Sequence, residues 1–128
     1  MKKGGILNPA LCRILAETGH TDMITICDRG FPVPPGPERL DLALVDDIPT
    51  VLDVLSAISK EFVIDRIIVA DEMLEASPKR YSHLQEQFPD LPIMKVPHLR
   101  FKELCPESRA VIRTGDTAPY ANLIIVSG

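Results

Sequence analysis

The sequence predicts an α/β domain in which a central, mostly parallel sheet lies between helical layers. Short apolar runs rich in valine and isoleucine, typical of buried strands, alternate with segments whose apolar residues recur at helical spacing. Such alternation favours parallel strands connected by helices that pack on both faces of the sheet. The 128 residues match the commonest size of one domain, and no repeat or linker divides them. We therefore expect one domain spanning residues 1–128.

The first helix is predicted from about residue 9 to residue 18. Asn8-Pro9 is a strong helix start, because the asparagine side chain caps free N–H groups and proline is preset for the first turn. Gly19 is expected to end the helix in a left-handed conformation. The short, apolar and β-branched stretch Met23–Cys27 then predicts a buried strand.

The remaining elements are predicted from the same signals. Thr50 and Asp53 form a capping-box pattern that starts a helix. The proline-rich residues 28–37 are expected to form an ordered loop, because proline is excluded from helix interiors and central strands. Further helices and strands are expected at the following residues: helices at 51–60, 78–88 and 98–105, and strands at 40–44, 62–70, 92–96, 110–113 and 123–126. The last two strands, adjacent in the sequence, are expected to form an antiparallel pair.

Composition and charge argue against several partners and cellular locations. The chain has 14 basic and 18 acidic side chains and a net charge of −4, which argues against nucleic acid and anionic membranes as partners. No apolar run approaches the roughly 20 residues of a membrane helix, and Arg13 and Glu17 interrupt the stretch where a signal peptide would need one. The odd number of cysteines (Cys12, Cys27 and Cys105) fits reduced thiols in a cytoplasmic protein.

Two ionisable residues flank the first predicted strand. His20 follows the first helix, and Asp28 lies at the far end of the strand. A histidine, with a pKa of about 6.5, can donate or accept a proton at neutral pH, and α/β proteins hold ligands at the carboxyl ends of strands. Each residue also has a structural interpretation, since His20 could bond the last helix carbonyls and Asp28 could cap a turn.

A second histidine and a polar loop are the other candidates. His98 follows Pro97 at a predicted strand end, although it could equally be only the first residue of a helix. The loop at residues 113–122 is rich in hydrogen-bonding groups, and ligand contacts concentrate on such loops. Tyr120 and Asn122 suit hydroxyl-rich ligands, because each both donates and accepts hydrogen bonds. The remaining histidine is expected to face solvent from the middle of a helix.

The motifs of nucleotide cofactors and of serine hydrolases are absent. No Gly-x-Gly-x-x-Gly, P-loop or Gly-x-Ser-x-Gly sequence occurs. A catalytic metal has only weak support, from four residues that could in principle ligate one: His20, Asp22, Asp28 and His98. The two histidines and the polar loop are the residues that could carry proton transfer on a small, hydroxyl-rich ligand.

Several ordered motifs resemble those of one protein family. In chain order they are Lys2-Lys3 before Gly-Ile-Leu-Asn, Gly19-His20-Thr21-Asp22, Asp28-x-Gly30-x-Pro32-Val33-Pro34, Leu40-Asp41-Leu42-Ala43-Leu44, His98-x-x-Phe101-Lys102, Ala110-Val111-Ile112-Arg113-Thr114-Gly115 and Pro119-Tyr120-Ala121-Asn122. Together they are far more specific than any one motif. On them the chain resembles the D-ribose pyranase and L-fucose mutarotase (RbsD/FucU) family along essentially its whole length, and within it the D-ribose pyranase branch.

The resemblance implies a fold, an activity and a site. It implies a three-layer α/β/α domain and an isomerase that interconverts pyranose and furanose forms, and anomers, of D-ribose or a related monosaccharide. His20 would be the catalytic proton donor. The sugar-binding residues would be Asp28, His98, Tyr120, Ala121 and Asn122. The resemblance implies no metal or organic cofactor, and it implies a ring-shaped homo-oligomer, a pentamer or decamer, with the pocket near a subunit boundary.

The chain departs from the family pattern at a few positions, and two other functions stay open. Arg29 replaces a small residue, Leu99-Arg100 replaces acidic residues, and Asp116 stands where glutamate is usual. One alternative is a non-catalytic monosaccharide-binding protein linked to sugar uptake, which would bind ribose without accelerating its ring exchange. The other is a metal-dependent isomerase that converts an aldose to a ketose, which would lose activity with a chelator.

Overall fold

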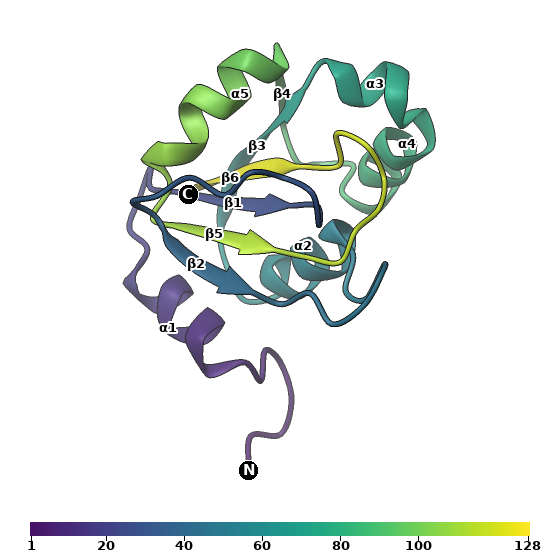
Figure 1. Ribbon diagram of the computed structural model, residues 1–128. Helices are drawn as coiled ribbons and strands as arrows, with labels where there is room; N and C mark the ends of the chain where they lie inside the picture. Colours follow the sequence, from purple (N-terminus) through teal and green to yellow (C-terminus); the bar gives the residue numbers. More distant parts are fainter.

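A mixed six-stranded sheet with helices on both faces forms the centre of the computed structural model, which describes all 128 residues (Figure 1). The strands are β1 (Met23–Cys27), β2 (Glu38–Asp41), β3 (Ile64–Ala70), β4 (Ile93–Val96), β5 (Ala110–Arg113) and β6 (Leu123–Ser127). The helices are α1 (Pro9–Glu17), α2 (Val51–Ser59), α3 (Glu72–Ala76), α4 (Pro78–Gln87) and α5 (His98–Leu104), the last followed by a 3-10 turn at Cys105–Glu107. None of the helices is long and apolar enough to cross a membrane.

The strand order is β2-β5-β1-β6-β3-β4, and only β6 runs antiparallel to its neighbours. The predicted α/β class with a mostly parallel sheet is therefore confirmed. The predicted antiparallel pairing of β5 with β6 is wrong, because β1 lies between them and β5 pairs in parallel with β1 and β2. Hairpin loops usually have two to five residues, whereas residues 114–122 form a longer connection that passes the end of β1.

The start of α1 is as predicted, and its end is not. The N–H of Leu11 donates to Asn8 Oδ1 at 2.9 Å, which is the expected cap. At the other end Thr18 satisfies the final carbonyls, because its hydroxyl bonds the Ile14 carbonyl and its N–H bonds Leu15. The helix therefore needs no left-handed Gly19, and the left-handed residue of this turn is Thr21, with φ +70°.

Two further elements differ from the prediction, and both differences have local causes. The second strand ends at Asp41 rather than residue 44, because the Asp41 carboxylate accepts the N–H of Ala43 and turns the chain. Helix α3 was not predicted, since five residues are too few to show helical periodicity. The capping box at Thr50 and Asp53 is confirmed by reciprocal bonds of 2.9 and 3.1 Å.

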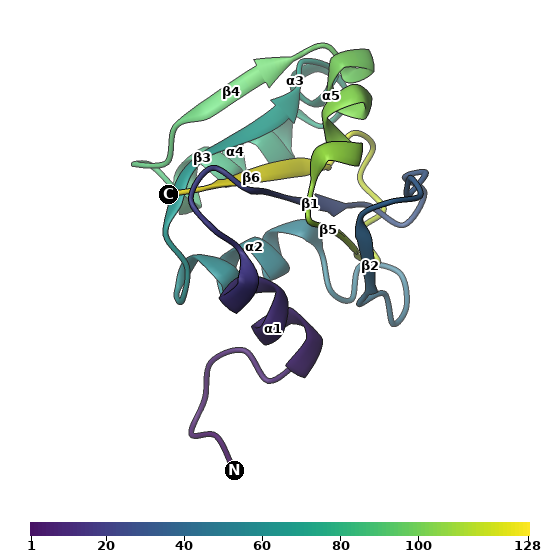
Figure 2. The ribbon, with the colours of Figure 1, turned by 90° about the vertical axis from the view of Figure 1, so that its left-hand side faces the viewer.

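Each face of the sheet has its own core. Helices α1, α2, α3 and α4 contribute to a cluster of 18 buried residues on one face, and α5 contributes to a cluster of nine on the other. Ile124 and Ile125 of β6 belong to different clusters, as expected for side chains that alternate along a strand. Figures 1 and 2 show α5 across the sheet from α1 and α2, which is the three-layer arrangement.

Candidate active site

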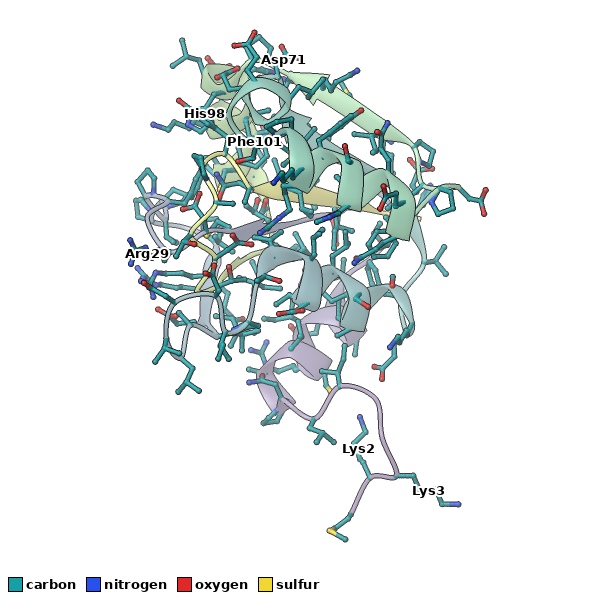
Figure 3. The ribbon with its side chains drawn as sticks, turned by 90° about the vertical axis from the view of Figure 1, so that its right-hand side faces the viewer. Lys2, Lys3, Arg29, Asp71, His98 and Phe101 are labelled. Atoms are coloured by element: carbon teal, nitrogen blue, oxygen red, sulfur yellow. The ribbon has the colours of Figure 1, made fainter.

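Most of the predicted site residues meet at one edge of the sheet. Asp28 follows β1 and His98 follows β4, so both lie at carboxyl ends of parallel strands. Asn122 precedes the antiparallel β6 and therefore lies at the same edge. In Figure 3, His98 and Phe101 lie together, far from Lys2 and Lys3. The carboxyl edge of an α/β sheet is the usual place for a ligand site.

Asp28 and Asn122 are joined directly. The backbone N–H of Asp28 donates to Asn122 Oδ1 at 2.7 Å, and Asn122 is 3% exposed. Burial raises the pKa of the Asp28 carboxyl, although the Gly30 N–H, which donates to Asp28 Oδ1 at 2.9 Å, and the side chain of Asn122 oppose the rise. A half-buried carboxyl whose pKa is raised by burial is typical of a ligand-binding or catalytic position.

His98 lies in a small aromatic cluster. Its ring stacks on Phe101 with centroids 6.3 Å apart, and it meets Tyr120 edge to face at 5.0 Å and Phe31 at 6.5 Å. The Nδ1 atom of His98 is buried and has no hydrogen-bond partner within the chain. An unsatisfied buried polar atom is an exception in native proteins and is often associated with a functional site.

The loop before β6 brings Tyr120 to His98. Tyr120 has φ +55°, a left-handed conformation that costs a non-glycine residue about 1 kcal/mol or more and is found at ligand sites. The Ser77 hydroxyl anchors this loop by donating to the Pro119 carbonyl at 2.6 Å. Ala121 is 1% exposed and packs in the larger core, so almost none of its surface is accessible within one chain.

Other polar residues of the same loop fasten it to the body of the protein. Asp116 is completely buried, forms an ion pair with Arg80 and accepts the N–H of Val51 at 2.9 Å. The Thr114 hydroxyl donates to the Cys27 carbonyl at 2.8 Å. The side chains of Asp116 and Thr114 thus form hydrogen bonds and an ion pair within the protein. Fewer residues of the loop are therefore free to contact a ligand than its polar composition suggests.

His20 lies at the opposite edge of the sheet from these residues. It is exposed in the turn between α1 and β1, and its imidazole makes no hydrogen bond within the chain. It therefore does not bond the last carbonyls of α1. The strand β1, which is about 16 Å long with five residues at about 3.3 Å each, lies between His20 and Asp28. One chain therefore does not bring His20 to Asp28 and His98.

Two plausible chemistries at this edge have no structural support within the chain. Cys27 adjoins Asp28, but burial raises the pKa of its thiol to about 12, so it stays protonated at neutral pH and is a poor nucleophile. No three His, Cys, Asp or Glu side chains are grouped closely enough to hold a metal ion.

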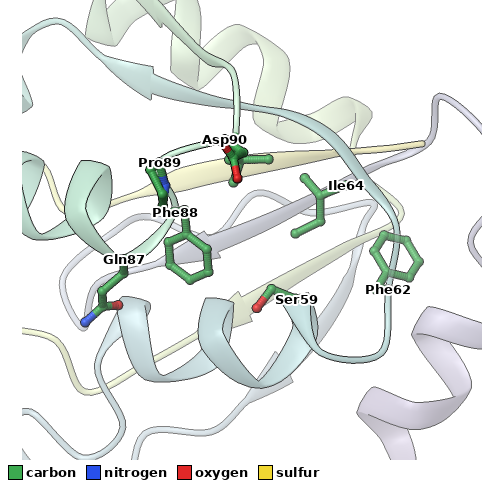
Figure 4. Close-up of a pocket in the computed structure, with 8 residues that line it drawn as sticks. Ser59, Phe62, Ile64, Gln87, Phe88, Pro89 and Asp90 are labelled. Atoms are coloured by element: carbon green, nitrogen blue, oxygen red, sulfur yellow. The ribbon is translucent and has the colours of Figure 1, made fainter.

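A surface pocket of about 440 Å³ near Ser59 and Phe88 contains none of the predicted residues (Figure 4).

Sequence reasoning missed two residues at this edge, Phe31 and Glu72. Phe31 is 7% exposed and also contacts Phe101, with centroids 5.9 Å apart. A large aromatic side chain inside a proline-rich loop was a usable signal for it. Glu72, whose carboxylate bonds the backbone N–H of His98, lies just after β3. The rule that selected Asp28, an acidic residue at a strand end, applies equally to Glu72.

The family model of the RbsD / FucU transport protein family matches residues 1–128. The chain belongs to this family. A D-ribose pyranase of Geobacillus thermodenitrificans is 46% identical over 128 residues, which cover 100% of this chain and 97% of that protein. A D-ribose pyranase of Laribacter hongkongensis is also 46% identical, with 100% of this chain and 98% of the relative covered. The resemblance seen in the sequence motifs is thus confirmed.

Solved structures of RbsD and FucU proteins share the fold. RbsD of Bacillus subtilis, solved in complex with D-ribose, has a TM-score of 0.95 and 40% identity, covering 100% of this chain and 98% of that one. The fucose mutarotase of Streptococcus pneumoniae, solved with L-fucose, has a TM-score of 0.83 and 22% identity, with 95% and 93% covered. At the latter identity the likeness concerns the fold alone.

Proposed function

We propose that this protein is a D-ribose pyranase, an intramolecular isomerase that interconverts the pyranose and furanose forms of D-ribose in a single domain spanning residues 1–128. The observation that carries the proposal is the full-length identity of 46% to D-ribose pyranases. The ribose-bound state of the 40% identical RbsD of Bacillus subtilis adds support. The clustering of Asp28, His98, Tyr120 and Asn122 at one edge supports a site for a hydroxyl-rich ligand.

The proposed reaction requires only proton transfers and one change of ring oxygen. In the pyranose, the bond between C1 and the ring oxygen O5 breaks as O5 gains a proton and the hydroxyl on C1 loses one to become a carbonyl. The hydroxyl on C4 then attacks C1 and loses its proton, and the carbonyl oxygen gains one. This exchange occurs slowly in water, so general acid–base catalysis worth about 10²–10⁴-fold is sufficient.

The residues at the carboxyl edge would bind and orient the sugar. The Asp28 carboxylate accepts hydrogen bonds from sugar hydroxyls, and the Tyr120 hydroxyl can donate and accept. The Asn122 amide would donate through its Nδ2, since its Oδ1 already accepts the Asp28 N–H. The rings of Tyr120 and Phe31 offer apolar surface to the carbon atoms of the sugar. Restricting the open-chain form in this way brings the attacking hydroxyl close to C1 and lowers the entropic cost of reclosure.

His20 would be the proton donor, and it would act in the pocket of a second copy of the chain. His20 is exposed, has no hydrogen-bond partner within its own chain and lies at the other end of β1, a strand about 16 Å long, from its own Asp28. An oligomer that places the turn between α1 and β1 against the carboxyl edge of a neighbour would complete each site. A histidine in that place can give a proton to the ring oxygen near neutral pH.

We also propose that the protein is a cytoplasmic homo-oligomer, a pentamer or a pair of pentamers. The exposed apolar side chains of Leu44, Val45 and Ile48 lie on the loop that contacts Gly115, close to the carboxyl edge. Burial of such side chains between copies would be favourable. All three cysteines are free, which fits a reducing compartment. Light scattering coupled to gel filtration measures the oligomer size.

Exchange spectroscopy by NMR on equilibrated D-ribose tests the proposed activity. The account predicts faster exchange between pyranose and furanose signals in proportion to protein concentration, with no ketose formed and no loss on adding a chelator. Saturable ribose binding without faster exchange would instead indicate a binding protein. Appearance of ribulose, abolished by a chelator, would indicate a metal-dependent isomerase.

A further inference from the structure

Helix α5, which begins with His98, has no N-terminal cap of its own. Pro97 occupies the cap position and has neither a side-chain oxygen nor an N–H group, and the first turn of α5 contains no acidic residue. The first N–H groups of a helix have no acceptor within the helix and need one from elsewhere. The N–H of His98 is the first such group in α5.

Glu72 supplies the missing acceptor from a different helix. Both of its carboxylate oxygens accept the N–H of His98, at 3.0 and 3.2 Å. The N–H of Asp71 donates to the Val96 carbonyl at 2.7 Å, which extends the ladder between β3 and β4 and brings the start of α3 beside the start of α5. A carboxylate in this place makes a charge-assisted hydrogen bond and faces the positive end of α5.

The orientation of the His98 ring depends on the hydrogen bond between the His98 N–H and the Glu72 carboxylate. The imidazole makes no hydrogen bond of its own within the chain, and its buried Nδ1 has no partner. Only packing against Phe101, Tyr120 and Phe31 and the position of the His98 backbone therefore determine where the ring points. Loss of the backbone bond frees the first turn of α5 and, with it, the ring.

The C-terminal end of α3 is linked to the loop that holds Tyr120, the ring that contacts His98. Ser77 follows α3 directly, and its hydroxyl donates to the carbonyl of Pro119, the residue before Tyr120. The two rings that meet at 5.0 Å, those of His98 and Tyr120, are thus both positioned from one short helix. This arrangement makes α3 a common support for two predicted sugar-binding side chains.

We propose that Glu72 is a positioning residue of the ribose site: it holds the His98 backbone, and thereby the His98 ring, in the orientation that binds the sugar. The inference rests on the proposed function, in which His98 contacts ribose. Glu72 acts through His98 and does not itself touch the sugar. Its removal should therefore weaken ribose binding more than it slows the proton transfers assigned to His20.

The test compares Glu72→Ala and Glu72→Gln with Glu75→Ala, a control in the same helix whose exposed side chain makes no hydrogen bond. We expect Glu72→Ala to raise KM for ribose about five- to tenfold, which corresponds to about 1–1.4 kcal/mol, the net worth of an ordinary hydrogen bond, with kcat within about twofold of wild type. Glu72→Gln keeps an oxygen acceptor and should fall between Glu72→Ala and wild type. A KM for Glu72→Ala equal to that of Glu75→Ala would overturn the inference.

A double variant separates positioning from general stabilisation. In a His98→Ala background, adding Glu72→Ala should raise KM no further, because the side chain that Glu72 positions is gone. A further rise would overturn the proposed role. The His98 amide resonance, followed by ¹⁵N NMR, should move in Glu72→Ala and stay in Glu75→Ala. Wild-type protein that fails to accelerate ribose exchange would refute the proposed function, whereas normal wild-type exchange with an unchanged KM in Glu72→Ala would refute only the role of Glu72.

Discussion

At the carboxyl edge of the sheet the backbone N–H of Asp28 donates to Asn122 Oδ1 and that of His98 donates to the Glu72 carboxylate, whereas at the amino edge His20 is exposed and makes no hydrogen bond within the chain. The first edge has the features of an organised binding site. The second presents one titratable side chain on a short turn. The difference supports the proposal that neither edge is a complete active site, and that the proposed reaction needs the two edges of different copies to meet.

The largest expected effect comes from removing the side chain at the amino edge. His20→Ala should lower the acceleration of ribose exchange by about 10²–10⁴-fold, the usual worth of a general acid. Because His20 is exposed and unbonded, the free energy of unfolding should change by less than about 0.5 kcal/mol. His83→Ala is the matched control, since His83 is exposed in α4. NMR exchange rates and urea unfolding measure both quantities, and equal exchange rates in the two variants would contradict the assignment.

A smaller effect is expected from disturbing the support of the carboxyl edge. A Cβ atom at Gly115 would lie 2.2 Å from the carbonyl oxygen of Val45 and 3.1 Å from that of Ile48. Because these are backbone atoms that cannot swing away, Gly115→Ala should lower the free energy of unfolding by about 1–3 kcal/mol. It should also raise KM, because the loop that presents Tyr120 begins here. Gly4→Ala, with no atom within 4 Å of its Cβ, is the control, and equal urea midpoints for the two variants would contradict the prediction.

The smallest effect concerns the ionisation of Asp28. Burial raises its pKa in the folded chain above the ordinary value of 3.8, so between these two pKa values the folded chain holds more protons than the unfolded chain. Its contribution to stability is therefore present at low pH and is lost as the pH rises through the raised pKa. Because asparagine has no titrating carboxyl group, the Asp28→Asn variant should not show this loss of stability as the pH rises.

Urea unfolding from about pH 3 to pH 7 measures the free energy of unfolding of wild type minus that of Asp28→Asn. The difference should decline as the pH rises above 3.8 and level off above the raised pKa. Asp47 provides a contrast, because hydrogen bonds from Thr117 lower its pKa. For Asp47→Asn the sign reverses, and wild type should lose its advantage as the pH falls. The same sign for both residues would contradict the account of Asp28.

Local patterns predicted most of the elements, whereas the wrong pairing of β5 arose from long-range contacts. The strand Met23–Cys27 was predicted to the residue, because apolar β-branched residues end abruptly at polar neighbours. The pairing of β5 was predicted wrongly, since which strand lies next to it depends on the path of a nine-residue loop. That path depends on Asp116, whose buried ion pair with Arg80 links residues 36 positions apart. No local pattern reveals such a contact.

In the candidate site, too, some residues could be selected from local sequence patterns and others depend on contacts between distant residues. Asp28, His98, Tyr120 and Asn122 were selected from the sequence, and the structure brings them to one edge in two contacting pairs. Glu72 was overlooked although it lies just after a predicted strand, as Asp28 does, and its bond to a backbone N–H 26 residues away leaves no local pattern. The separation of His20 from Asp28, in contrast, was already implied by the length of the strand between them. A strand end and a strand start cannot serve one small ligand in a single chain.

Mixing two inactive variants tests most directly whether the site is divided between copies. His20→Ala lacks the proton donor, and Asp28→Ala lacks a sugar-binding group, so each alone should leave ribose exchange near the uncatalysed rate. After the oligomers are dissociated and reassembled together, about one quarter of the pockets should combine His20 of one chain with Asp28 of the other, if subunits associate at random. The account predicts recovery of about one quarter of wild-type exchange activity in the mixture. No recovery from reassembled oligomers that demonstrably contain both variants would contradict it.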